Sequence, residues 1–273
     1  MKFQLIFTIL SALFSLYSCT MPDKLSQASL KKVEYYVQNH SLNIEIGNPL
    51  MCPLTISAKS PDPTVQKKLD KNFPAAIPPK TDTIISYRTD KSKEEISITF
   101  SGAMGDPSNP VRKEEINLPF PEGRTYKIIQ GYNGSYSHSS NYSRYAIDFD
   151  MKIGDTVCSV ANGYVVGVIE GYSKGGKTKK WRDYANFITL FHPEMNVYTQ
   201  YVHLAHEGSF VEVGDRVVAG QVIGLSGKTG YTDIEHLHFN VLEAVNSGIQ
   251  STEISFKEGY KGADLKRGDL VKR

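Results

Sequence analysis

Cysteine is scarce in this sequence, with only three among 273 residues: Cys19, Cys52 and Cys158. Cysteines this far apart form no recognisable metal motif, which excludes a structural four-cysteine or Cys/His zinc site. Cys52 and Cys158 could join as one disulfide between two parts of the chain, or each could be a small buried hydrophobic side chain. The sequence favours the second alternative.

An excess of charge of one sign is also missing. The chain has 31 Lys and Arg against 29 Asp and Glu, a formal net charge of +2. Nucleic-acid-binding proteins usually carry a broad basic surface, so this balance predicts no nucleic-acid partner. A locally basic run, Lys174 to Arg182, contains two glycines, and we expect it to be a solvated loop.

The N-terminus carries a hydrophobic run of limited length. Lys2 precedes twelve largely apolar residues, Leu5 to Leu16, a length typical of a signal peptide and too short to span a bilayer comfortably. The segment "LYSC" that follows resembles a bacterial lipobox. We therefore predict a signal peptide at 1–18, membrane anchorage through a lipidated Cys19, and a linker at 19–30. Ordinary secretion with an unmodified cysteine is the alternative, and both predict export to the cell envelope, facing the periplasm or the cell exterior.

What the sequence does contain favours β structure. Its 16 Tyr, 22 Gly and 13 Pro are typical of strands and turns rather than helix bundles. Residues 31–118 alternate in hydrophobicity and are interrupted by turn clusters such as "SPDPT", which predicts a small β-sandwich acting as a spacer or interaction domain. Residues 119–250 predict a second, antiparallel β domain, and residues 251–273 an extension that packs on it or trails from it. The expected fold class is mostly β.

Two turn patterns mark the second domain. Asn162-Gly163 lies between two short apolar runs and predicts a β-hairpin, and "FHPEMN" predicts a second hairpin. "IGDTV" and "VGDRV" share a Gly-Asp-x-Val core that is similar to the paired turns of biotinyl/lipoyl-type β domains. Those carrier domains need a modifiable lysine at a hairpin tip, which is missing here, so only the shape is expected to be related.

Histidines cluster near the C-terminal half, with five of the seven between residues 192 and 238. His236 and His238 lie one residue apart in a strand-like segment, so their side chains point to the same face. His138 precedes "YAIDFD", which carries Asp148 and Asp150. Nitrogen and oxygen donors of this kind suit Zn²⁺, and three of them leave a fourth position open, as in catalytic sites.

The order of these motifs resembles a known family. "GYNGSYSHSSNYSRYAIDFDMKIGDTVCSVANGYV", then "YVHL", then "HLHF" are similar to the lysostaphin-type (LytM-like) zinc metalloendopeptidases, which are peptidoglycan hydrolases of the bacterial envelope. The resemblance covers about Gly123 to Glu243. It implies an enzyme that hydrolyses peptide cross-links between peptidoglycan stem peptides through a metal-activated water.

The resemblance also implies the roles of individual residues. His138, Asp148 and His238 would bind one zinc ion. His203, from "YVHL", and His236 would be catalytic, one as general base and the other stabilising the developing oxyanion. Which histidine takes which role stays open, as does the identity of the cross-link that is cut.

Several alternatives remain at this point. Nine residues separate the first histidine from the aspartate, where many family members have three, so a longer loop must close back to the metal. Asp150 could orient a metal ligand or face solvent. His192 and His206 are expected to be structural and solvated, respectively. The alternative function is a catalytically silent wall-binding module that activates another hydrolase, although every expected ligand is present.

Overall fold

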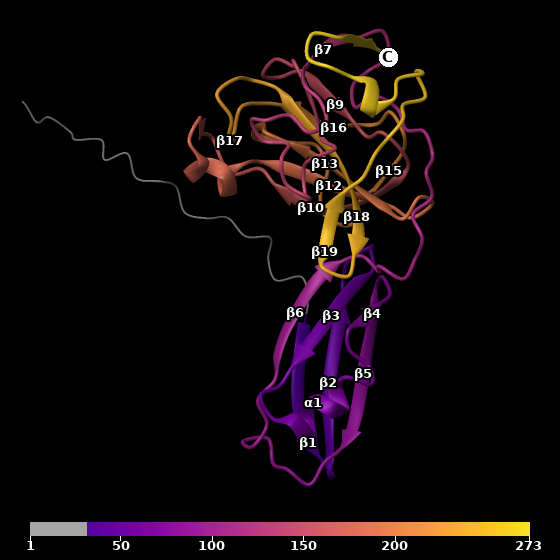
Figure 1. The fold of residues 1–273 in the computed structure, drawn as a ribbon, viewed down its shortest axis with the longest axis vertical. Helices are drawn as coiled ribbons and strands as arrows, with labels where there is room; N and C mark the ends of the chain where they lie inside the picture. Colours follow the sequence, from indigo (N-terminus) through magenta and orange to yellow (C-terminus); the bar gives the residue numbers. More distant parts are fainter. Residues whose placement is uncertain (1–31) are drawn as a thin grey trace, which may run out of the picture.

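The structure, a computed structural model, describes residues 32–273 and consists of two units stacked end to end (Figure 1). Strands dominate both units and their sheets are antiparallel apart from one two-stranded pair, which confirms the mostly β prediction. The predicted signal peptide, the lipidated Cys19 and the linker lie outside the described residues. No helix within 32–273 has the length and apolar character needed to cross a membrane.

The N-terminal unit contains two three-stranded sheets, whose orders are β1-β2-β5 and β4-β3-β6. Alternate residues of β2 point inward, so that Leu42, Ile44 and Ile46 are buried against Ile56 of the facing sheet. The strands are β1 (Lys32–Gln38), β2 (Ser41–Asn48), β3 (Leu54–Lys59), β4 (Ala75–Ile77), β5 (Thr81–Arg88) and β6 (Thr99–Met104).

A short helix, α1 (Pro63–Leu69), lies where the sequence predicted only a turn. Asp62 caps it, because its Oδ1 accepts hydrogen bonds from the backbone N–H groups of Thr64 at 2.7 Å and Val65 at 3.1 Å. Proline in the first turn is compatible with this start, and the buried Leu69 fixes the helix to the sheet. The segment "SPDPT", which predicted a turn, therefore forms the capped N-terminus of this helix.

The second unit is built on a nine-stranded sheet of order β15-β10-β12-β13-β18-β8-β7-β20, with β19 paired to β18. A three-stranded sheet, β14-β16-β9, shares one core with it. The strands are β7 (Thr125–Gln130), β8 (Ile147–Phe149), β9 (Thr156–Cys158), β10 (Gly163–Ile169), β11 (Gly175–Gly176), β12 (Phe187–His192), β13 (Val197–Val202), β14 (Leu204–Ser209), β15 (Arg216–Val217), β16 (Val222–Ser226), β17 (Gly230–Tyr231), β18 (Leu237–Val245), β19 (Gly248–Ser251) and β20 (Leu270–Lys272), with short 3-10 helices at Lys179–Tyr184 and Gly262–Asp264.

The hairpin predicted at Asn162-Gly163 is wrong. The strands on either side of this dipeptide belong to different sheets, since β9 pairs with β16 whereas β10 pairs with β12 and β15. Asn162 instead holds neighbouring segments: its carbonyl accepts from His192 Nδ1 at 2.7 Å and its side-chain oxygen from the Ala219 N–H at 3.0 Å. The hairpin predicted at "FHPEMN" is confirmed by the pairing of β12 with β13.

The two units share a hydrophobic contact. Val166, Phe191, Tyr198 and Leu242 of the second unit are buried in the same cluster as the core of the N-terminal unit. The β18–β19 hairpin extends towards β6 at this contact (Figure 1). Phe191 and Tyr198 pack with ring centroids 5.0 Å apart. The units are therefore packed against each other and are not only tethered.

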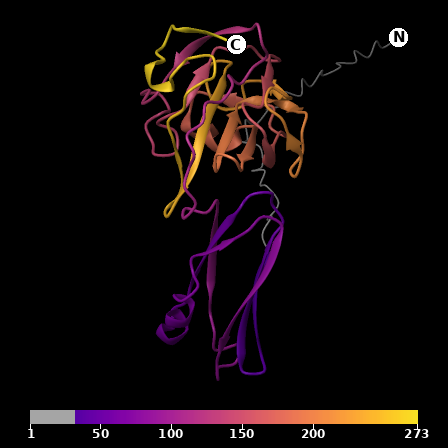
Figure 2. The ribbon, with the colours of Figure 1, turned by 90° about the vertical axis from the view of Figure 1, so that its right-hand side faces the viewer.

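The C-terminal residues pack on the second unit at the end away from the N-terminal unit (Figure 2). β20 pairs with β7, and Val271 is fully buried. Of the two arrangements expected for 251–273, the structure has the packed one. Cys52 and Cys158 are both buried and unbonded, as the second of their two alternatives predicted.

Candidate metal centre

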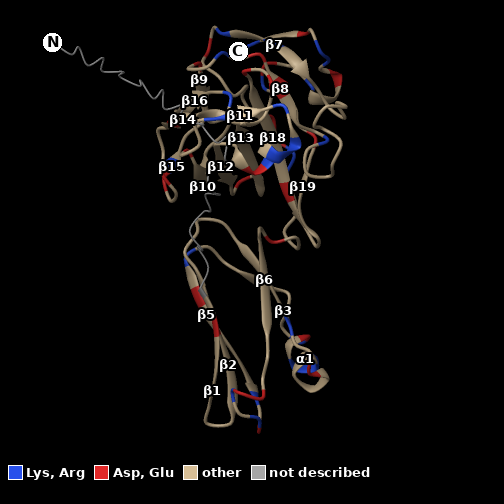
Figure 3. Ribbon diagram, turned by 90° about the vertical axis from the view of Figure 1, so that its left-hand side faces the viewer, with Lys and Arg blue, Asp and Glu red and all other residues tan. Residues whose placement is uncertain are grey.

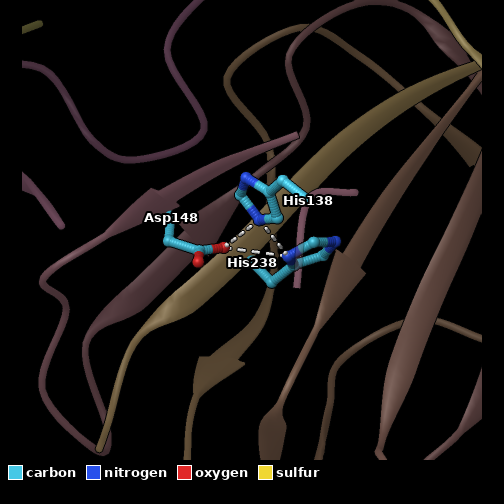
Figure 4. A group of neighbouring side chains, drawn as sticks. All are labelled: His138, Asp148 and His238. Carbon is cyan, nitrogen blue, oxygen red and sulfur yellow. Dashed lines mark hydrogen bonds and ion pairs between the residues drawn. The ribbon is translucent and has the colours of Figure 1, made fainter. Parts of the chain in front are cut away.

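The side chains of His138 and Asp148, ten residues apart, meet that of His238, which follows Asp148 by 90 residues (Figure 4). Asp148 on β8 and His238 on β18 are direct partners in the strand register, and His138 reaches them from the loop after β7. His138 Nε2 lies 3.2 Å from both Asp148 Oδ1 and His238 Nδ1, and His238 Nδ1 lies 2.8 Å from that oxygen. All three predicted metal ligands are thus brought together.

The separations between these donor atoms fit one small metal ion. Tetrahedral Zn²⁺ with bonds of about 2.0–2.1 Å places its ligand atoms about 3.3 Å apart. The observed 2.8–3.2 Å is slightly shorter, as expected for groups that hydrogen-bond to one another. Two imidazole nitrogens and one carboxylate oxygen form a donor set that zinc accepts, with a fourth position left open.

Neighbouring groups fix the orientation of the trio. His138 Nδ1 donates to the Gly131 carbonyl at 2.8 Å, which leaves Nε2 free to bind a metal. Gln130 Nε2 donates to Asp148 Oδ2 at 3.0 Å, so the other carboxylate oxygen faces the histidines. The sequence reasoning missed Gln130, because no local pattern marks a glutamine at the end of a strand.

Of the two alternatives predicted for Asp150, orienting a metal ligand or facing solvent, the structure favours the second. Its carboxylate lies 3.5 Å from Lys127 Nζ and 3.2 Å from Lys152 Nζ. It makes no hydrogen bond to the trio within the described chain. The strand β8 ends at Phe149, so the alternation that would have placed Asp150 beside Asp148 stops before it.

Burial and mutual contact set the charges of the trio. Burial alone would raise the pKa of Asp148, but His236, His138 and His238 outweigh it and hold that pKa well below its usual range. Burial likewise opposes the charged form of His138, yet the contact with Asp148 raises its pKa overall, whereas burial prevails at His238 and lowers its pKa. The carboxylate of Asp148 therefore favours positive charge on His138 more than on His238.

His203 and His236 lie beside the trio with ring centroids 4.6 Å apart. His203 Nδ1 donates to the Thr229 carbonyl at 2.6 Å, and His236 Nδ1 lies 3.1 Å from the Ile234 carbonyl. Because a carbonyl oxygen only accepts, these contacts place a proton on Nδ1 in both rings and leave Nε2 as the nitrogen available for proton exchange. His236 Nε2 lies 3.8 Å from Asp148 Oδ1, so this pair faces the ligands from one side.

His203 shows two further signs of a specialised position. Burial, with smaller contributions from His236 and His238, lowers its pKa well below the ordinary value, so the ring is neutral. Its backbone has a φ of 67°, which is uncommon for a residue other than glycine and clusters at functional sites. The chain turns sharply between β13 and β14 to place this side chain.

A cavity of about 300 Å³ opens beside the histidines. Tyr136 and Tyr231 stack at its edge, with ring centroids 5.2 Å apart and planes 13° from parallel. The lining residues are Ile129, Gln130, Tyr136, Ser137, Asp148, His203, Tyr231, Thr232, Asp233, Ile234, His236 and Arg267. All come from the second unit, so the N-terminal unit does not contribute to this cavity.

The remaining histidines lie outside the site. His192 is fully buried, where Nδ1 bonds to Asn162 and Nε2 to the Thr199 hydroxyl at 2.8 Å. His206 is exposed on β14, as expected for a solvated side chain. His40 is exposed in the turn between β1 and β2 with a φ of 58°.

Comparison with known proteins identifies related sequences. The model of Peptidase family M23 matches residues 142–250, which include Asp148, His203, His236 and His238 but not His138. An uncharacterized metalloprotease of Buchnera aphidicola subsp. Baizongia pistaciae (strain Bp) is 30% identical over 213 residues, 77% of this chain and 48% of its own length. Glycyl-glycine endopeptidase ALE-1 of Staphylococcus capitis is 35% identical over 156 residues, 50% of this chain and 39% of its own length.

A solved structure is similar as well. The catalytic domain of the antimicrobial peptidase lysostaphin from Staphylococcus simulans has 31% sequence identity and a TM-score of 0.32, covering 52% of this chain and 88% of that one. The chain spans less than half the length of the two curated relatives named above.

Proposed function

We propose that this chain, which belongs to peptidase family M23, is a zinc-dependent endopeptidase that hydrolyses peptide cross-links of bacterial peptidoglycan. The observation that carries the proposal is the combination of a His-Asp-His trio with two further imidazoles, His203 and His236, beside one cavity. A site that only stabilised the fold would not need the second pair. The relatives named as glycyl-glycine endopeptidase and lysostaphin support peptidoglycan as the substrate.

The chain's own residues would divide the work. His138, Asp148 and His238 would hold the zinc ion, which when bound supplies a Lewis acid that lowers the pKa of water and polarises a peptide carbonyl. Because Nδ1 faces a backbone carbonyl in both rings, Nε2 of His203 or His236 would be the nitrogen that takes the proton from the attacking water. The same proton then passes to the leaving amine. The second imidazole would stabilise the charge that develops on the carbonyl oxygen when it carries a proton on Nε2 as well as on Nδ1 and donates that second N–H to the oxygen.

The test is digestion of purified cell walls. The full chain loaded with zinc is expected to release new amino groups, and a chelator or the substitution His238→Ala should abolish the release. The alternative, a catalytically silent module that binds walls and activates another hydrolase, is not favoured because the trio and both additional histidines are present. If the wild-type chain and His238→Ala bind cell walls equally and neither cleaves them, the peptidase proposal is contradicted.

We also propose that the protein is exported and anchored in the cell envelope through a lipidated Cys19. Support comes from the short apolar N-terminal run and the "LYSC" segment. Cys19→Ala is expected to shift the protein from the membrane fraction to the soluble envelope or culture medium. Unchanged membrane association in that variant would argue against the lipid anchor while leaving export intact.

A further inference from the structure

Arg267 lines the cavity beside the metal centre although it lies beyond the residues matched by the family model. It belongs to the C-terminal segment that packs on the second unit, at the end remote from the N-terminal unit (Figure 3). Asp148, His236 and Arg267 line the same space of about 300 Å³, which is small for a ligand site. A group bound by Arg267 would therefore lie in the same cavity as the proposed metal ligand Asp148.

The backbone on either side of Arg267 is fixed. The residue lies in a tight turn in which the Asp269 N–H donates to the Lys266 carbonyl at 3.1 Å and Asp269 Oδ2 accepts from the Lys266 N–H at 2.7 Å. Gly268 supplies the positive φ of 103° that such a turn requires, and its N–H donates to the Ile128 carbonyl on β7 at 2.8 Å. The turn is thus attached to the strand that carries Gln130, which orients Asp148.

The charge of Arg267 is not used within the described part of the chain. Among residues 32–273 no carboxylate lies within ion-pair distance of its guanidinium, and it is the only Lys or Arg among the residues that line the cavity. Asp233 also lines the cavity but makes no ion pair with it. A guanidinium offers a planar fork of donors that matches a carboxylate in two parallel hydrogen bonds.

We propose that Arg267 binds a free carboxylate that the substrate carries next to the scissile amide, and so determines which cross-links the enzyme cuts. The inference rests on the proposed endopeptidase function. A cross-link made through the amine of a diamino dicarboxylic acid bears a carboxylate on the carbon next to the scissile nitrogen. A glycine bridge carries a peptide amide there in place of a free carboxylate, so the exposed Arg267 would form no charge-assisted hydrogen bonds with it and would stay solvated.

The experiment compares two synthetic cross-linked peptides that differ in one group, a carboxylate or a carboxamide next to the scissile nitrogen. The zinc-loaded full chain is expected to cleave the carboxylate peptide with a kcat/KM higher by about tenfold to a hundredfold, the effect of one charge-assisted hydrogen bond. Arg267→Gln should remove this preference by slowing only the carboxylate peptide, and Arg267→Lys should restore part of it. Lys266→Gln is the matched control, because this neighbouring cation does not line the cavity.

Binding provides a second readout that does not depend on cleavage. The affinities of both peptides are measured by calorimetry with and without Arg267→Gln, in a zinc-loaded His236→Ala background. If the wild type binds the carboxylate peptide more tightly and Arg267→Gln removes this preference, the inference is supported, whether or not the peptides are cut. Absence of cleavage by the zinc-loaded wild type would contradict the proposed endopeptidase function and not the role of Arg267. Loss of cleavage of both peptides to the same extent, or no effect on either, would show that Arg267 does not read a carboxylate.

Discussion

His238 and Asp148 face each other across the antiparallel strands β18 and β8, and Nδ1 of the histidine lies 2.8 Å from Oδ1 of the aspartate. Strand pairing therefore fixes two of the three proposed ligands before any metal is present. His138 is different, because it reaches the pair from a loop and depends on its hydrogen bond to Gly131. Asp148 and His238 are therefore held by the sheet, whereas the position of His138 depends on the conformation of its loop.

Removal of a ligand should release the metal. His238→Ala and Asp148→Ala are each expected to reduce bound zinc to less than about a tenth of one equivalent after dialysis, because two remaining donors hold the ion poorly. Metal content is measured by mass spectrometry of the purified protein, and activity should disappear with it. His206→Ala, an exposed histidine, is the control and should retain one equivalent. Full zinc retention in both ligand variants would contradict the assignment.

His203 and His236 should affect the reaction without affecting the metal. Replacement of either by alanine is expected to lower kcat by about 100- to 10,000-fold, the usual contribution of a general acid–base group, with zinc content unchanged. Steady-state kinetics and metal analysis are done on the same samples. If either variant loses its zinc, that histidine acts as a ligand and the division of roles is wrong.

Gln130 should tune metal affinity. Gln130→Ala removes the donor to Asp148 Oδ2 and is expected to weaken zinc binding by about tenfold to a hundredfold. Competition with a chelator of known affinity measures the change. Gln130→Met is the complementary variant: it keeps roughly the length of the side chain without the N–H donor, and it should weaken binding to a similar extent. An unchanged affinity in both would show that the strand alone orients Asp148.

His192 should make stability depend on pH. Burial lowers its pKa from 6.5 to about 4, so between these values the unfolded chain binds a proton that the folded chain does not. The free energy of unfolding is therefore at its full value above pH 6.5, where the ring is neutral in both states. It declines as pH falls towards 4, by about 3 kcal/mol in total, because protonation stabilises only the unfolded chain in this range. Urea unfolding at several pH values should show a shallower dependence in His192→Gln than in the wild type. The exposed His40→Gln serves as the control.

The contact between the units should contribute to global stability. Phe191 is buried in the shared cluster, so Phe191→Ala is expected to lower the free energy of unfolding by about 3–5 kcal/mol. Ile84 is 57% exposed on β5, and Ile84→Ala should change it by less than about 0.5 kcal/mol. Chemical unfolding followed by circular dichroism measures both. A small effect of Phe191→Ala would mean that the two units are held together by other contacts.

The sequence by itself predicted which residue types meet at the site. Imidazole nitrogens and carboxylate oxygens are donors that suit zinc. The i, i+2 spacing of His236 and His238 also predicts that both rings point to one face of an extended segment, although His236 lies just before the start of β18. The alternation of β2 and the turn at "FHPEMN" are equally local properties, which is why strands and one hairpin could be predicted. The misread segments, Asn162-Gly163 and the start of α1, carry turn residues whose local preference does not specify which elements the turn connects.

Only the tertiary structure decided which groups support that chemistry. Gln130 reaches Asp148 through the pairing of β7 with β8, 18 residues along the chain, and the Gly131 carbonyl meets His138 across a loop. Arg267 is placed by the pairing of β20 with β7, and none of these neighbours is marked by a local sequence pattern. Asp150 is a residue for which a local pattern was misleading. Strand alternation suggested that it lies on the same face as Asp148, but β8 ends at Phe149 and Asp150 contacts Lys127 and Lys152 instead. The residue types specify what can react, and the long-range packing of β7, β8, β18 and the C-terminal turn specifies where the reaction is held.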